Sequence, residues 1–234
     1  MSDQLDFETY LVITPNKFGI YLIDTKNLKY LYNQEQKIYS DGVNLDLSNL
    51  NKFLDKHIFV IEKLINQFVK NIFLIIDSSK INNINISLKK KNYDKSLNKK
   101  NLENTIKEIK DLFVENYQDQ QIIHILIKGI LVDGTYHLSY VNDLNADEIC
   151  IEIQFKSIKN KFISEVDDIL EKYQVKIIKC LDKNYIETFL KGDDLNLIQM
   201  AFKIKSGHNY NEVALVPKKT KNHGFFEKFF QLFS

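Results

Sequence analysis

Arginine is missing from this 234-residue sequence, in which all 32 basic residues are lysine. Paired recognition of phosphate oxygens or of guanine uses the planar guanidinium group, so its absence argues against nucleic-acid and phosphate binding. The formal net charge of +1 also argues against a protein that binds polyanions. We therefore expect no nucleic-acid partner.

Glycine is scarce as well, with seven residues that form no cluster. Loops that hold nucleotide phosphates through backbone N–H groups are rich in glycine, and the sequence contains no such loop. We therefore predict a protein without a cofactor, and we assign no catalytic, cofactor-binding or metal-binding residue.

Cysteines and long apolar runs are also few. Cys150 and Cys180 lie in apolar contexts, which predicts buried free thiols in a reducing cytosol. No apolar run approaches the ~20 residues of a membrane-spanning helix. The first ten residues lack a basic region followed by an apolar core, so we expect no secretion signal.

The stretch from Gly42 to Ser79 organises the chain. Ser48 is the expected N-cap of a helix that continues to Val69. The run at 72–76 is apolar without alternation and predicts a strand buried on both faces, which indicates a layered α/β domain. The apolar face of the helix repeats at three- and four-residue steps through Leu50, Phe53, Leu54, His57, Ile58, Ile61, Leu64, Ile65, Phe68 and Val69.

Alternating and periodic patterns predict the other elements. We expect strands at 10–13, 18–24, 28–32, 81–88, 121–132 (a pair broken near Gly129), 148–155, 175–180 and 213–216, with an added edge at 37–39. We expect helices at 102–117, 159–173, 185–190 and 195–204.

Three groups of side chains invite a chemical role. His124 lies on an apolar strand without an acidic or nucleophilic residue nearby in sequence, so we predict a structural role. Glu148 and Glu152 share one face of a half-exposed strand and are expected to be solvated. The basic segment 89–100 is either a solvated loop or a weak patch for acidic lipids or an acidic partner.

The C-terminal stretch combines a basic linker, 217–223, with an aromatic helix, 224–234. On a helical wheel its apolar side chains form one stripe, and Glu227, Gln231 and Ser234 lie opposite. We predict an interfacial helix whose aromatic rings enter the lipid while lysines meet anionic headgroups. The expected membrane-binding residues are Phe225, Phe226, Phe229, Phe230, Leu232, Phe233, Lys218, Lys219, Lys221 and Lys228.

The order of these parts resembles the bacterial cell-division protein family FtsA, a membrane-tethered branch of the actin family. The resemblance lies in Gly42-Val43-Asn44, the long helix, the buried strand and the turn at 78–81, and then in the strand IIHILI at 122–127 and the turn at 132–134. It implies an α/β fold with an actin-like first domain, an inserted SHS2-like subdomain and no second actin-like domain. The implied limits are 7–81 with 174–216 for the actin-like domain, 82–173 for the insert, 217–223 for the linker and 224–234 for the membrane-targeting helix.

The same resemblance implies a function. It predicts a cell-division scaffold on the cytoplasmic side of the membrane at the division site, bound to anionic lipids. Later division proteins would bind through 82–173, with FtsZ and self-association as further contacts. The turn Thr14-Pro15-Asn16-Lys17 departs from the family's Asp-x-Gly phosphate loop, and the second phosphate loop is missing, so we expect no nucleotide hydrolysis and no enzyme.

Three alternatives remain open from the sequence. The chain could be an ATP-binding protein of the actin family with unusual loops. It could be the related pilus-assembly actin-like protein, although that family binds a peptide of an inner-membrane partner and needs no amphipathic helix of its own. It could also be a cytosolic domain whose C-terminal helix packs on the core.

Overall fold

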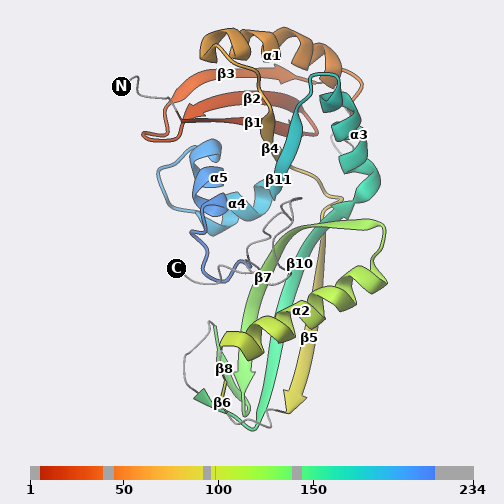
Figure 1. Cartoon of the computed structure of the whole chain (residues 1–234), viewed down its shortest axis with the longest axis vertical. Coiled ribbons are helices and arrows are strands. Elements are labelled where there is room, and N and C mark those ends of the chain that lie inside the picture. Colours follow the sequence, from red (N-terminus) through yellow and green to blue (C-terminus); the bar gives the residue numbers. More distant parts are fainter. Residues whose placement is uncertain (1–5, 39–44, 92–95, 98, 139–143, 214–234) are drawn as a thin grey trace, which may run out of the picture. The chain divides into compact units, whose positions relative to one another are not determined.

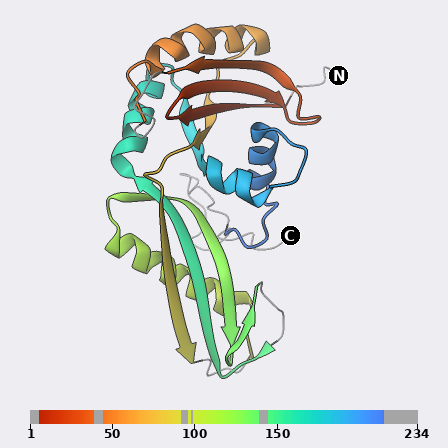
Figure 2. The ribbon, with the colours of Figure 1, turned by 180° about the vertical axis from the view of Figure 1, so that it is seen from behind.

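The computed structural model describes residues 6–38, 45–91, 96–97, 99–138 and 144–213. Its internal contacts divide the chain into two compact units. Unit 1 comprises Met1–Ile81 and Ile158–Ser206, and unit 2 comprises Asn82–Ser157 and Gly207–Ser234. Both are drawn in Figures 1 and 2. No helix of the described residues is long and apolar enough to cross a membrane.

Unit 1 is built on a five-stranded sheet in the order β11-β4-β1-β2-β3. Its strands are β1 (Phe7–Thr14), β2 (Lys17–Asp24), β3 (Tyr30–Lys37), β4 (Asn71–Ile76) and β11 (Lys176–Asp182). The strands β1, β4 and β11 run parallel, whereas β2 and β3 continue the sheet antiparallel. The central strands are buried on both faces, as the unbroken apolar run of β4 predicts.

Helices cover both faces of this sheet. Figures 1 and 2 show α1 (Leu50–Ile65) over one face and α4 (Lys183–Phe189) with α5 (Leu197–Lys205) over the other. The helix α3 (Asn160–Glu171) packs near β11. This arrangement buries β1 and most of β4 on both faces, whereas β3 at one edge and the first half of β11 at the other remain accessible.

The predicted long helix is shorter than its apolar pattern suggests. Asn66 has a left-handed φ of 54° and ends α1 there. Phe68 is consequently 77% exposed, whereas Val69 is buried and its N–H donates to Glu62 Oε1 at 3.1 Å. The N-cap is Asn49 rather than the predicted Ser48, and it makes no side-chain cap hydrogen bond.

Unit 2 contains a sheet in the order β5-β10-β7-β8 and a small pair, β6 with β9. Its helix, α2 (Lys99–Asn116), packs its buried side chains against one face of the larger sheet, including Leu102, Ile106, Ile109 and Phe113. The bounds are β5 (Asn82–Lys91), β6 (Ser96–Leu97), β7 (Gln120–Val132), β8 (Thr135–His137), β9 (Leu144–Asn145) and β10 (Glu148–Lys159).

The predicted break near Gly129 is wrong, because β7 is one continuous strand. A Cβ atom at Gly129 would overlap the ring of Tyr136, so only glycine leaves room for this ring. The Tyr136 hydroxyl donates to the Lys128 carbonyl at 2.7 Å. Gly129 therefore serves cross-strand packing and not chain reversal.

The second segment of unit 1 is Ile158–Ser206, whereas the sequence predicted limits of 174 and 216 for the corresponding segment. The helix α3 belongs to unit 1, where it packs near β11. Residues from Gly207 onward belong to unit 2, where Val213 N–H donates to the Ile125 carbonyl at 2.9 Å. The strand predicted at 213–216 is an isolated bridge between Leu126 and Glu212 in the described residues, and positions 214–216 lie outside them.

The two thiols differ in their surroundings. Cys180 is buried, and burial raises the pKa of its thiol. Cys150 is only half-buried on the polar face of β10, so its predicted burial is wrong. Both cysteines are free.

We expect the stability of unit 1 to fall as the pH drops below about 6.5, because of His57 on α1. Its ring lies 4.6 Å from that of Phe53, and its Nδ1 lies 2.7 Å from the Tyr32 hydroxyl. Burial and then the charge of Lys56 lower the pKa of His57, so the unfolded chain binds the proton more readily than the folded chain. The contribution is full above the unfolded pKa and is lost as the pH falls from there toward the folded pKa.

Urea unfolding between pH 7.5 and 5.0 measures this loss. The matched variant His57→Gln keeps a polar side chain beside Tyr32 but does not titrate, so its stability should change less over the same range. Equal pH dependence of the two proteins would contradict the assignment to His57.

Candidate functional site

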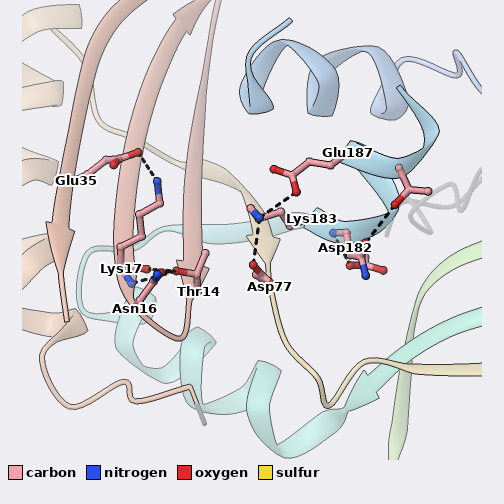
Figure 3. A network of polar contacts seen from close by, with 10 residues as sticks. Thr14, Asn16, Lys17, Glu35, Asp77, Asp182, Lys183 and Glu187 are labelled. Carbon is pink, nitrogen blue, oxygen red and sulfur yellow. Dashed lines mark hydrogen bonds and ion pairs between the residues drawn. The ribbon is translucent and has the colours of Figure 1, made fainter. Parts of the chain in front are cut away.

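Polar side chains gather at the carboxyl ends of the parallel strands of unit 1. Thr14 ends β1, Asp77 follows β4 and Asp182 ends β11, and the registers place Ile13, Ile76 and Asp182 side by side. Ligands of open α/β sheets bind outside these strand ends. This edge, shown in Figure 3, is therefore the candidate site.

The first turn of the candidate site is closed on itself. The Lys17 backbone N–H donates to the Thr14 hydroxyl at 3.0 Å, and the same hydroxyl lies 2.8 Å from Asn16 Oδ1. Pro15 has no N–H to offer. The Thr14 side chain therefore accepts the Lys17 N–H. In a phosphate-binding loop, such an N–H would point at the ligand.

The lysine of this turn is also engaged. Lys17 Nζ lies 2.8 Å from Oε1 of Glu35 on β3, and the Tyr21 hydroxyl donates to the same oxygen. Hydrogen bonds from Lys17 and then Tyr21 hold the pKa of Glu35 below its usual range. The Lys17 side chain remains about one-third exposed, so the pair is a surface contact of modest strength.

A second lysine occupies the space between two carboxylates. Lys183, the first residue of α4, places Nζ 3.1 Å from Asp77 Oδ2 and 3.0 Å from Glu187 Oε2 (Figure 3). Burial alone would lower the pKa of Lys183, but the contacts with Glu187 and Asp77 raise it above its usual value. Lys183 thus supplies the positive charge that these carboxylates require.

The remaining acid of the site caps a helix. Asp182 is 3% exposed, and its Oδ1 accepts the Asn184 N–H at 3.0 Å at the start of α4. The described residues contain no group of three acidic, histidine or cysteine side chains placed to hold a metal ion. A cation placed at Asp77 and Glu187 would compete with the Lys183 ammonium group that already contacts both carboxylates.

The structure buries His124 and places beside it an acidic partner that is distant in sequence. The ring is 1% exposed on β7, and its Nδ1 lies 2.8 Å from Oε1 of Glu212, 88 residues later in the chain. Backbone hydrogen bonds hold the Glu212 segment against β7, from Ile127 N–H to the Asn211 carbonyl at 2.8 Å and from Val213 N–H to the Ile125 carbonyl.

The other sequence-predicted side chains are not brought together at this edge. Glu148 and Glu152 lie half-buried on β10 of unit 2, and Glu148 pairs with Lys89 at 2.6 Å. All ten predicted membrane-binding residues fall within 214–234, outside the described residues. Sequence reasoning missed Asp77, Asp182 and Lys183, although each lies directly after an apolar strand or at its end.

The chain was compared with known proteins. No protein-family model matches it, and no curated protein matches its sequence. Its structure is similar to a chain of the PilM–PilN type IV pilus biogenesis complex, with a TM-score of 0.50 and 8% identity over 78% of this chain and 49% of that chain. The fold is shared. The α/β fold class expected from the sequence is confirmed by the two sheets and their helices.

Two other solved structures are similar to a lower degree. The cytoplasmic domain of EpsL, an inner membrane component of the type II secretion system of Vibrio cholerae, has a TM-score of 0.40 and 7% identity over 77% of this chain and 59% of that chain. A Bacteroides thetaiotaomicron protein with an actin-like ATPase fold and unknown function has a TM-score of 0.36 and 12% identity over 81% and 58%. The chain thus spans about half to three-fifths of these matched chains.

Proposed function

We propose that this protein is a scaffold of actin-like fold that holds protein partners at a membrane surface without hydrolysing nucleotide. The observation that carries the proposal is the closed polar edge of unit 1, where Lys183 lies between Asp77 and Glu187. An edge whose N–H groups and charges are engaged within the chain favours a structural role over phosphate chemistry.

Titration calorimetry with Mg-ATP tests the first half of this proposal. We expect no binding, because the turn at Thr14 and the carboxylates at Asp77 and Glu187 are already engaged. Tight binding of Mg-ATP would reject the scaffold in favour of an ATP-binding protein of the actin family.

We expect the membrane attachment to depend on the aromatic stripe at 224–234. The double change Phe229→Glu and Phe230→Glu introduces two charges into that stripe and should move the protein from anionic liposomes to the supernatant, because buried aromatic rings supply the attachment. Liposome co-sedimentation measures the bound fraction.

The matched control places the same charges on the opposite side of the helix. Gln231→Glu with Ser234→Glu adds two carboxylates to the polar side and should retain most of the binding. Equal loss of liposome binding in both variants would show that the added negative charge, and not its position in the aromatic stripe, lowers the binding. A protein that unfolds when 224–234 is deleted would instead show that the helix packs on the core.

Two cellular assemblies are candidates for the one in which this scaffold acts. The fold shared with a chain of the PilM–PilN type IV pilus biogenesis complex favours a pilus-type assembly, with another protein as the partner. The aromatic C-terminal stripe favours the cell-division scaffold, since a protein tethered by a membrane partner needs no such helix. Localisation of a tagged protein, with and without 224–234, separates them, because midcell recruitment would indicate division and its absence the other assembly.

A further inference from the structure

The larger sheet of unit 2 ends at a long strand whose outer side takes no other described strand. In the order β5-β10-β7-β8, β5 pairs with β10 over ten positions from Asn82 to Lys91. The backbone groups on its other side form a row that another extended strand can join. This edge is independent of the polar site and of the C-terminal stripe.

The edge carries an apolar row on the face that bears α2. Ile84, Ile86 and Leu88 pack against the core of unit 2, yet each is only partly buried because the sheet ends at β5. The side chains between them, Asn85 and Ser87, are exposed on the opposite face. Adding a strand beside β5 would complete the burial of the apolar row.

Lysines on an edge strand ordinarily prevent such pairing. Here two of the three are turned toward carboxylates of their own unit. Lys90 Nζ lies 2.5 Å from Glu108 Oε2 on α2, and Lys89 Nζ lies 2.6 Å from Glu148 Oε2 on β10. Their charge is thus partly balanced within unit 2.

We propose that two copies of this chain pair antiparallel along β5, with Ile86 opposite Ile86 of the second copy. In this register Ile84 lies opposite Leu88, so apolar residues meet apolar ones, and Lys89 and Lys90 lie opposite Asn83 and Asn82. A parallel arrangement would instead align the lysines of the two copies. The strand is therefore self-complementary in one direction only.

The helix α2 supports the same register. It crosses the sheet obliquely in Figures 1 and 2, and its C-terminal end reaches the β5 side. Glu115 follows Glu108 by two helical turns and shares its side of α2. The register brings Lys90 and Lys91 of the second copy toward the Asn82 end of β5, on the side of the C-terminal turn of α2 that carries Glu115. Two copies would also carry two C-terminal stripes, which strengthens membrane attachment through avidity.

Sedimentation velocity without lipid tests the pairing, and its outcome does not depend on the proposed function. We expect a monomer–dimer equilibrium in the full chain. In the register above, position 85 faces position 87 of the second copy. Asn85→Lys with Ser87→Lys therefore creates two repulsive pairs and should raise the dimer Kd by roughly tenfold. Asn85→Glu with Ser87→Lys creates two attractive pairs and should leave the dimer as tight or tighter.

Both changes fall on exposed side chains and remove the same 3.2 Å contact between Asn85 and Gln154, so the two variants should unfold alike. A chain that stays monomeric at every concentration overturns the proposal. A dimer whose Kd changes equally in both double variants also overturns the proposal, because the contact between the two copies would then lie away from β5. A monomer that instead pairs along β5 with a strand of a different protein would also overturn it.

Discussion

Replacing Phe155 with alanine is expected to lower the free energy of unfolding of unit 2 by about 3–5 kcal/mol. Phe155 on β10 is fully buried, and its ring centroid lies 4.6 Å from that of Phe113 on α2. The change removes the aromatic pair and leaves a cavity between the helix and the sheet. Such a loss is a large fraction of the stability of a small domain.

Hydrogen exchange at the amides of β5, β7 and β10 measures this effect where it arises. Gln154→Ala is the matched control, because the neighbouring side chain points to the polar face and its loss should cost at most about 0.5 kcal/mol. The amides of β1 and β4 provide an internal reference in unit 1. Similar losses for Phe155→Ala and Gln154→Ala would contradict a core between α2 and β10.

Ending the chain after Ser206 is expected to destabilise unit 2, whereas ending it after Val213 should not. The shorter chain loses the Glu212 partner of buried His124, at about 1–3 kcal/mol. It also loses the burial of Val213, at about 1.5–3 kcal/mol. The two costs arise in one unit although the deleted residues follow α5 of unit 1 in sequence.

Thermal unfolding of both truncated chains, with hydrogen exchange at β7, tests this prediction. The protein ending at Val213 retains the hydrogen bonds from Ile127 to Asn211 and from Val213 to Ile125, so it serves as the matched control. If the chain ending at Ser206 keeps full protection along β7, the segment 207–213 is dispensable for unit 2.

Local patterns predicted much of the secondary structure. The strict alternation at 148–155 predicted the half-exposed strand, because one face of β10 packs on α2 and the other meets solvent. The three- and four-residue spacing from Leu50 to Ile61 predicted α1 for the same reason. The end of α1 escaped prediction because Asn66 adopts a left-handed conformation that hydrophobic periodicity does not register.

The candidate site could not be assembled from sequence in this way. Asp77 and Lys183 are 106 residues apart, and they meet because β4 and β11 are parallel neighbours. His124 and Glu212 are likewise joined by strand pairing across 88 residues. Polar residues at strand ends were the available signal, but the order of strands decides which of them become neighbours.

The short segment that closes over β7 also determines how a mechanical load would enter the protein. Tension applied at Val213 would act first on its hydrogen bond to Ile125, and next on the contact between Glu212 and His124. The strand β7 is therefore the point of attachment for the segment 207–213, which ends the described part of the chain. A pull at that end would strain the sheet of unit 2 before it reached α5.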